Sequence, residues 1–354
     1  MTIQTNRYVF IDYVRSVAII FVVLCHAVEA VYSWDFEFLA ILSDQTNFFR
    51  ITAFALGRTF GVPFFLMITG YLLLDRTYDV NGVKQFYINN WLRLIVCTMA
   101  WFALYDIFVK YYSKEDLSLF ILLKDVLFLH KGKLGHQWYM PMIIGYYAMI
   151  PFVATALKKE EAIRFVVVPY FVVLLYVSMI PFINKIITLY GLENLENQLS
   201  GGFTGGIYGL YIVLGWAIKR GYLKKCKTII LVLIIVTSTL FLIWFTYRFY
   251  RNTYSIWYDS PFVIASSVSL FEVASRLNRI PSNIFIKYMA KYSFGVYLVH
   301  WLIRDLHMIR NLIEPLRKPV QVIVLEVLLL VISYILVWLI GKIPKFGKLL
   351  CYIK

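Results

Sequence analysis

Long runs of apolar residues, separated by short polar stretches, fill almost the whole chain. A helix needs about 20 mainly apolar residues to cross the ~30 Å hydrocarbon core of a membrane. Runs of this kind lie at 11–32, 56–74, 92–110, 138–157, 164–183, 203–218, 228–247, 261–275, 287–304 and 320–341. The pattern predicts an all-α, polytopic membrane helix bundle of about ten transmembrane helices. Its weakest member is 261–275, which is short and contains Glu272.

The polar stretches between the runs are too short for a separate soluble domain. The longest are expected to be outer loops, near 33–55, 111–136 and 184–202. No internal repeat occurs, and the amino terminus leads directly into the first run without a cleavage site that would indicate a signal peptide. The sequence therefore predicts a single transmembrane domain over residues 1–354.

The amino-acid composition also indicates a protein that is embedded in lipid. Hydrophobic residues make up 61% and charged residues 16%, whereas soluble proteins hold about 25% charged residues. The net charge of +15 could suggest nucleic acid, but Lys and Arg fall in short clusters between apolar runs and form no basic stripe. We expect no nucleic-acid partner.

The basic clusters predict the orientation of the chain. With ten spans and a cytoplasmic amino terminus, the inner stretches hold 20 basic and four acidic residues, and the outer loops hold 14 basic and 12 acidic residues. Basic residues in short loops mark the cytoplasmic side. Both termini are therefore predicted to be cytoplasmic.

The four cysteines give no sign of a metal site. Cys25, Cys97, Cys226 and Cys351 lie inside or beside apolar runs, without the paired short spacing of zinc ligands or a disulfide framework. We expect packing roles for them and no bound metal.

Ionisable residues gather in the first apolar run, although each costs a few kcal/mol in a membrane and so usually faces the protein interior. Arg15, His26 and Glu29 share roughly one face of a helix, because the eleven-residue step from Arg15 to His26 is close to three turns. His26 lies roughly 16 Å further along the axis than Arg15. A long, thin cytosolic donor such as acyl-CoA fits this spacing, with its phosphates on Arg15 and its thioester beside His26.

A neutral imidazole at that depth could deprotonate a sugar hydroxyl for attack on the thioester, with Glu29 or a backbone carbonyl fixing its tautomer. Simpler roles stay open at this point. Arg15 can extend its guanidinium to the membrane interface, His26 can make one structural hydrogen bond, and Glu29 can be an outer-interface residue. The residues alone leave both interpretations open.

Four segments in order carry a family resemblance. They are the first run with Arg15 and His26, RTFGVPFFLMITGYLLL at 58–74, HQWYMPMIIGYYAMIP at 136–151, and YSFGVYLVHWLI at 292–303. The last two are similar to a His-x-Trp-Phe segment and a closing Ser-x-x-x-Tyr-x-x-His signature. Together they resemble the acyltransferase 3 family of integral-membrane acyltransferases, which modify bacterial surface polysaccharides, lipopolysaccharide and related glycans. The resemblance covers almost the whole chain.

The resemblance implies an activity and a membrane. It implies a multi-pass protein of the bacterial cytoplasmic membrane that moves an acyl group, usually acetyl, from cytoplasmic acyl-CoA to a hydroxyl of a surface glycan or its lipid-linked precursor. It also implies that His26 is the essential histidine, and Arg15 a contact of the donor. The family often has an Arg-x-x-Arg pair at the start of the third helix, which here is Asn90 and Arg93, so only Arg93 remains as a second donor contact.

Three further residues are candidates for acceptor binding: Arg58, His136 and Trp138. Trp138 could stack on a sugar face, although tryptophan at a membrane interface is commonly an anchoring residue, and so is an arginine such as Arg58 at a helix end. For His300 and Ser293 the sequence favours packing roles.

Two other functions stay open from sequence. A polysaccharide exporter or flippase without acyl-transfer chemistry would also use many helices, but the inverted repeats frequent in transporters are absent from the sequence. A membrane sensor or assembly partner would not need His26. The partners expected are a glycan acceptor and the lipid bilayer, and a second copy of the chain or polysaccharide-assembly proteins stay open.

Overall fold

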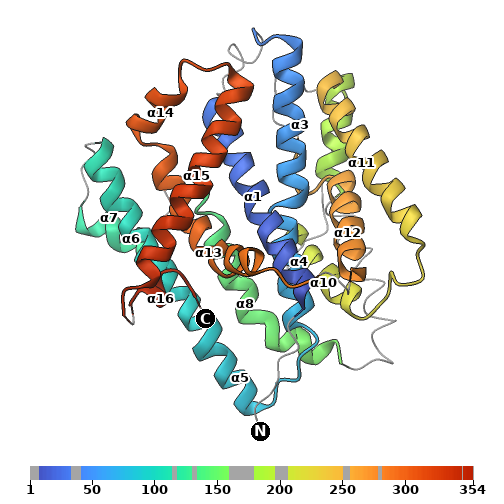
Figure 1. The fold of residues 1–354 in the computed structure, drawn as a ribbon. Coiled ribbons are helices and arrows are strands. Elements are labelled where there is room, and N and C mark those ends of the chain that lie inside the picture. Colours follow the sequence, from blue (N-terminus) through green and yellow to red (C-terminus); the bar gives the residue numbers. More distant parts are fainter. Residues whose placement is uncertain are drawn as a thin grey trace. The chain divides into compact units, whose positions relative to one another are not determined.

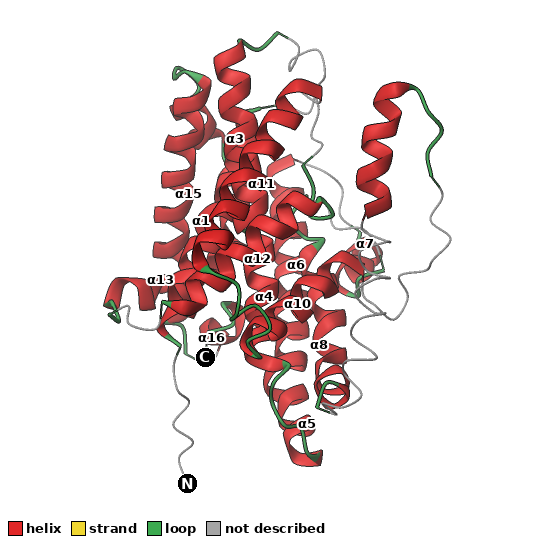
Figure 2. Ribbon diagram, turned by 90° about the vertical axis from the view of Figure 1, so that its right-hand side faces the viewer, coloured by secondary structure: helices red, strands yellow, loops and turns green. Residues whose placement is uncertain are grey.

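The structure is a computed structural model that describes residues 8–32, 41–113, 118–129, 134–158, 179–195, 206–249, 256–277, 281–344 and 346–353. Within these ranges the chain forms helices joined by turns and loops, and no strand occurs (Figures 1 and 2). The all-α prediction is confirmed.

Six helical segments in the described part are long and apolar enough to cross a membrane. They are Val9–Val31, Asp44–Leu73, Val80–Tyr112, Tyr139–Ala156, Thr228–Phe249 and Lys318–Gly341. Shorter or more charged helices occupy three more of the predicted runs, at Gly206–Lys219, Pro261–Arg276 and Ile284–Arg304. Most of the run at 164–183 lies outside the described residues. The protein is a multi-pass membrane protein, and the count of ten spans and the cytoplasmic termini remain predictions.

The chain divides into two compact units, each built from segments that are far apart in sequence. The first unit holds Met1–Asp75, Leu157–Ala290 and Arg317–Ile323, and the second holds Arg76–Ala156, Lys291–Leu316 and Val324–Lys354. Because each unit draws on both halves of the chain, no cut of the sequence would separate them. The single domain over 1–354 remains a prediction.

The most deeply buried span of the first unit is a bent pair, α3 (Asp44–Phe60) and α4 (Val62–Leu73). Helix α3 begins well before the predicted run because the Ser43 side chain accepts a hydrogen bond from the backbone N–H of Thr46, which caps the helix. The break at Gly61 precedes Pro63, which has no N–H and suits the first turn of a helix. Residues 44–55, predicted as part of an outer loop, are therefore helical.

Helix α4 packs directly against α10 (Gly206–Lys219), beside it in Figure 1. A Cβ on Gly70 would collide with the backbone of Ile212, and a Cβ on Gly215 with the backbone of Met67. Small residues that let two backbones touch are the usual way to join helices in lipid, where apolar burial gives no drive between them. These two glycines fix the crossing of α4 and α10.

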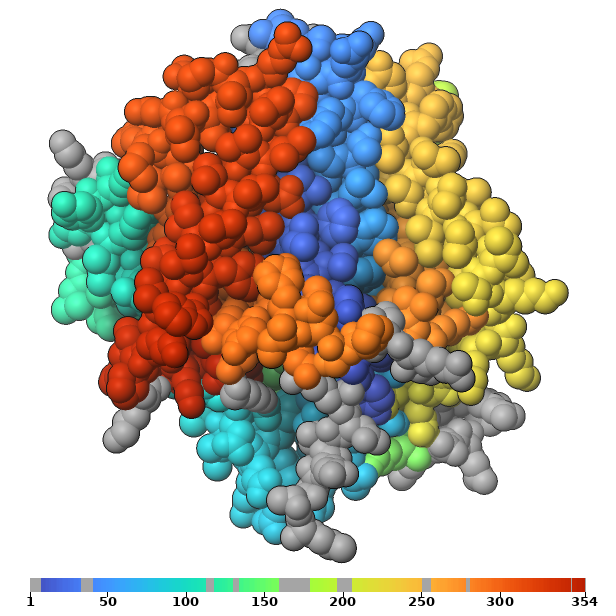
Figure 3. Space-filling view, viewed as in Figure 1, coloured from blue at the N-terminus to red at the C-terminus, as the bar shows by residue number. Residues whose placement is uncertain are grey.

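Helix α11 (Thr228–Phe249) packs on α12 (Pro261–Arg276) and leaves a long apolar side uncovered. Figure 3 shows α11, coloured yellow, open along its length. The side chains on this side include Ile229, Leu233, Val236, Leu240 and Trp244, all exposed. Such an all-apolar face suits contact with lipid.

The buried Glu272 of α12, which made the run at 261–275 uncertain, is paired within its own helix. Arg276 donates to the Glu272 carboxylate at 2.8 Å and also to the backbone oxygens of Cys226 and Leu223. The pair neutralises the charge and ties the loop before α11 to the end of α12.

The second unit is organised around α6 (Arg93–Ser113). It is preceded by α5 (Val80–Phe86) and a short π-helical turn, Tyr87–Leu92, and it is accompanied by α8 (Tyr139–Ala156) and α16 (Phe346–Leu350). The indole N–H of Trp101 donates to the Leu350 carbonyl at 2.7 Å. The carboxyl-terminal segment is thus bonded side-on to α6.

Candidate active site

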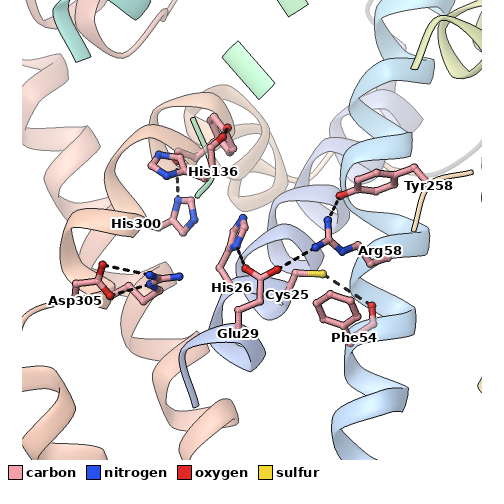
Figure 4. Close-up of polar contacts among 11 residues, drawn as sticks. Cys25, His26, Glu29, Phe54, Arg58, His136, Tyr258, His300 and Asp305 are labelled. Carbon is pink, nitrogen blue, oxygen red and sulfur yellow. Dashed lines mark hydrogen bonds and ion pairs between the residues drawn. The ribbon is translucent and has the colours of Figure 1, made fainter. Parts of the chain in front are cut away.

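Three charged side chains of the first unit form one hydrogen-bonded chain (Figure 4). Helix α1 (Val9–Val31) carries His26 and Glu29, and α3 carries Arg58. Nδ1 of His26 lies 2.6 Å from Oε2 of Glu29, and Arg58 donates to Oε1 of the same carboxylate at 3.0 Å. The three side chains are only 12%, 10% and 6% exposed, respectively. The structure therefore brings together His26, Glu29 and Arg58.

The close approach of α1 and α3 places these side chains within reach of each other. Gly57 precedes Arg58 and faces α1, where a Cβ would come within 2.5 Å of the Cys25 sulfur and 2.9 Å of the Phe21 carbonyl oxygen. Glycine at this position therefore lets the two helices touch next to Arg58 and one turn before Glu29.

The hydrogen bonds among His26, Glu29 and Arg58 indicate where each group carries its proton or its charge. A carboxylate accepts hydrogen bonds only, so the His26 nitrogen that faces Glu29 is the one that carries the proton. In that tautomer Nε2 is the basic nitrogen of the ring. Arg58 supplies the positive charge that a buried Glu29 carboxylate requires. The ring of His26 is thus oriented by a carboxylate, which is in turn held by an arginine.

Arg58 is also held from its other side by the segment between α11 and α12. Its second terminal nitrogen donates to the Tyr258 hydroxyl at 2.9 Å, and its guanidinium lies over the ring of Trp257, 4.5 Å from the centroid. The ring of Phe54 lies 4.7 Å from the same guanidinium. Tyr211 of α10 donates to the backbone oxygen of Tyr258 at 2.9 Å, which fixes the segment.

Arg58 lies in the last turn of α3, directly before the break at Gly61, where α4 continues the helical stretch. It is 5% exposed and stands halfway along the helical stretch Asp44–Leu73. An anchoring arginine extends into water, and the burial of Arg58 does not fit that role. Its predicted part in acceptor binding remains a prediction. Arg58 is part of the hydrogen-bonded chain with Glu29 and His26.

Arg15 lies on the same uninterrupted helix as His26 and is half-buried. The regular geometry of α1 keeps Arg15, His26 and Glu29 on roughly one face. The role of Arg15 in binding the donor remains a prediction.

The remaining predicted site residues belong to the second unit. His136 is 1% exposed, stacks on Trp301 with ring centroids 4.6 Å apart, and its Nε2 lies 3.1 Å from the Tyr105 hydroxyl. His300 is likewise buried, 5.5 Å from His136 between centroids (Figure 4). Trp138 is half-buried and contacts Tyr139 edge to face.

Arg93 bonds to the carboxyl-terminal segment. Its guanidinium donates to the backbone oxygens of Lys348 at 2.8 Å and Ile353 at 2.6 Å, and it lies over the ring of Tyr352. The structure thus gives Arg93 a local binding partner within the second unit. Its predicted contact with the donor remains a prediction.

Trp257 and Tyr258 were missed by sequence reasoning. They lie about 200 positions from Arg58, and an aromatic pair in a short polar stretch resembles any interfacial pair. The only local signal was Ser260 followed by Pro261, which marks the start of α12 directly behind them. Among the described residues no group of three or more His, Cys, Asp or Glu side chains is arranged to hold a metal ion.

The fold and the site define a multi-pass membrane protein with a buried histidine bonded to a carboxylate. The sequence profile of a family described as an acyltransferase domain matches residues 8–342. The chain therefore belongs to the acyltransferase 3 family and is a membrane acyltransferase. No curated protein and no solved structure matched the sequence.

Proposed function

We propose that the protein is an O-acyltransferase of the bacterial cytoplasmic membrane that moves an acyl group, most simply acetyl, from cytoplasmic acyl-CoA to a hydroxyl of a cell-surface glycan or its lipid-linked precursor. The observation that carries this proposal is the hydrogen-bonded chain from His26 through Glu29 to Arg58. A buried base with a defined tautomer is what activation of a hydroxyl requires.

In the proposed reaction, Nε2 of His26 takes the proton of the acceptor hydroxyl while the oxygen attacks the thioester carbonyl carbon. The carbon–sulfur bond then breaks, and the CoA thiolate takes the proton from the imidazolium and leaves as the free thiol. The products are an O-acyl ester and CoA. Glu29 holds the ring and stabilises the imidazolium while it carries the proton.

The donor is proposed to reach His26 from the cytoplasmic side. Arg15 lies on the same helix, and a separation of eleven residues corresponds to roughly 16 Å along the axis. A pantetheine arm has the length and slenderness for this path, with the CoA phosphates near Arg15. The position of Arg15 supports this assignment more directly than that of Arg93, which bonds to backbone oxygens of its own chain.

The proposal is tested with purified protein in lipid nanodiscs by measuring the release of CoA thiol from acetyl-CoA in the presence of glycan acceptors. His26→Ala should lower turnover by about 10²–10⁴-fold, the usual contribution of a general base. His307→Ala is the matched control, since His307 is exposed at the start of α14 (His307–Ile313) and stacks on Tyr112.

Native turnover in His26→Ala would overturn the assignment of the base. A native protein that released no CoA with any acceptor, yet moved glycan across a liposome membrane, would instead identify an exporter.

A further inference from the structure

Trp257 differs from the other members of the segment Ile256–Ser260. Ile256, Tyr258 and Ser260 are 1–3% exposed, whereas Trp257 is 37% exposed. One face of its ring is covered by the Arg58 guanidinium, and Trp257 and Tyr208 are joined by a side-chain hydrogen bond. A large apolar ring is thus held rigidly, partly open, one side chain away from the carboxylate that binds His26.

The run at 261–275 is predicted to cross the membrane, and this prediction places the segment that carries Trp257 at membrane depth. Helix α12 has 16 residues and so measures about 24 Å, less than the ~30 Å of the hydrocarbon core. The non-helical residues in front of it must then cover part of the remaining distance. Non-helical backbone at such depth occurs only where it is buried in protein or lines a water-filled cavity.

The surroundings of Trp257 include a charged pair. Asp259, two positions on, forms an ion pair with Lys185 at 3.4 Å, and these side chains are 13% and 28% exposed, respectively. A partly exposed ion pair is stable beside water or another polar group. The segment that carries the exposed indole therefore also carries a charged group in polar surroundings.

We propose that Trp257 is the platform on which a pyranose ring of the acceptor stacks. A sugar ring has a polar rim and an apolar C–H face. An indole ring binds the apolar face, and the ion pair of Asp259 and Lys185 supplies polar groups at the same segment for the rim. The guanidinium behind the indole fixes the ring plane. This inference rests on the proposed function, because it names the binding residue of the hydroxyl-bearing substrate. No sequence pattern had singled out Trp257, and Trp138 was the earlier candidate for stacking.

The test measures binding separately from turnover. Saturation-transfer NMR with the methyl glycosides of glucose, galactose and rhamnose is recorded on protein in nanodiscs without acyl-CoA. Trp257→Ala should weaken glycoside binding about tenfold and Trp257→Phe should restore most of it, since a phenyl ring keeps the stacking face. In turnover assays Trp257→Ala should raise KM for the acceptor and leave KM for acetyl-CoA unchanged.

Trp244→Ala is the matched control, because Trp244 is 54% exposed near the end of α11, the position of an ordinary interfacial tryptophan. Equal binding by Trp257→Ala and native protein would overturn the proposal, as would loss of binding in Trp138→Ala alone. Native protein that bound none of the glycosides would overturn it as well. Failure of the acyl transfer itself would appear differently, as an absence of CoA release despite normal glycoside binding.

Discussion

Arg58 is the residue on which the geometry of the site depends most. Its two terminal nitrogens serve two different partners, the Glu29 carboxylate at 3.0 Å and the Tyr258 hydroxyl at 2.9 Å. A guanidinium can make both bonds from one plane, whereas the ammonium of lysine is a point charge on a flexible stem. The two-pronged shape of the guanidinium, and not only its charge, thus joins α3 to the helix that carries His26.

Arg58→Lys should therefore fold and keep the charge but lose the alignment of Glu29. We expect turnover to fall about 10- to 100-fold, since a hydrogen bond to a charged group is worth ~1.5–3 kcal/mol. Arg58→Ala should in addition destabilise the fold by about 3–5 kcal/mol, because it leaves a buried carboxylate without its counter-charge. Turnover assays and thermal unfolding measure the two effects. Arg310→Lys, at a mostly exposed arginine, is the control, and unchanged turnover in Arg58→Lys would contradict this account.

At this scale the sequence predicted part of the site. The step of three residues from His26 to Glu29 placed both on one helix face and made their contact one of the open alternatives, and the structure has this contact at 2.6 Å. The sequence could not show that Glu29 and Tyr258 both bind Arg58. Glu29 is 29 positions from Arg58 in the sequence, and Tyr258 is 200 positions from it. Contacts at such separation depend on how helices cross, and a helix crossing leaves no periodic pattern in one sequence.

At the scale of elements, the contact of α1 with α3 depends on a single missing side chain. Gly57→Ala should push the two helices apart, because the new Cβ would meet Cys25 and the Phe21 carbonyl. We expect a loss of about 1–3 kcal/mol in stability together with lower turnover, since Arg58 lies next to the collision and Glu29 one turn from it. Thermal unfolding and CoA release measure both.

Two variants sharpen that test. Gly145→Ala in α8 is the control, since a Cβ there meets nothing within 4 Å. The double variant Gly57→Ala with Cys25→Ala removes the sulfur and should recover part of the loss, but not the part due to the Phe21 backbone. A Gly57→Ala protein with native stability and turnover would show that the helix contact does not position the site.

The carboxyl-terminal segment, residues 346–353, is held to α6 by Arg93. Arg93 donates to the backbone oxygens of Lys348 and Ile353, so Arg93→Ala should loosen residues 346–353. We expect faster hydrogen exchange in that segment, while Arg317→Ala, at an exposed arginine, should change nothing there. If Arg93→Ala left hydrogen exchange unaltered and raised KM for acetyl-CoA, the result would instead support the predicted contact of Arg93 with the donor.

Hydropathy predicted the existence of helices well and their lengths less well. Helices α1, α8, α11 and α15 (Lys318–Gly341) begin and end within a few residues of the predicted runs. Helix α3 starts earlier, because its first turns are capped and polar and so fall below the hydropathy of a span. Helix α12 matches the predicted run at 261–275 closely, but its 16 residues are fewer than the ~20 of a full span. The apolar pattern reports contact with lipid, and it does not show where a capped polar turn extends a helix.

For the whole molecule, the orientation in the membrane is still a prediction from charge. Basic residues outnumber acidic ones 20 to four on the predicted inner side and nearly balance them outside. Retention of positive charge on the cytoplasmic side should then place the carboxyl terminus in the cytoplasm. The same orientation places Arg15 on the side from which acyl-CoA is supplied and His26 beyond it, as the proposed reaction requires.

Reporter fusions test this orientation directly. A green fluorescent protein joined after residue 354 should fluoresce, and alkaline phosphatase at the same position should be inactive, since the first folds in the cytoplasm and the second needs the oxidising outer side. Alkaline phosphatase inserted at Glu193, in an exposed turn after Gly191, should be active because that turn is predicted to be outside. The reverse result at both positions would invert the molecule and place Arg15 on the side without acyl-CoA. The proposed entry of the donor along α1 would then be wrong, whereas the hydrogen bonds among His26, Glu29 and Arg58 do not depend on the orientation.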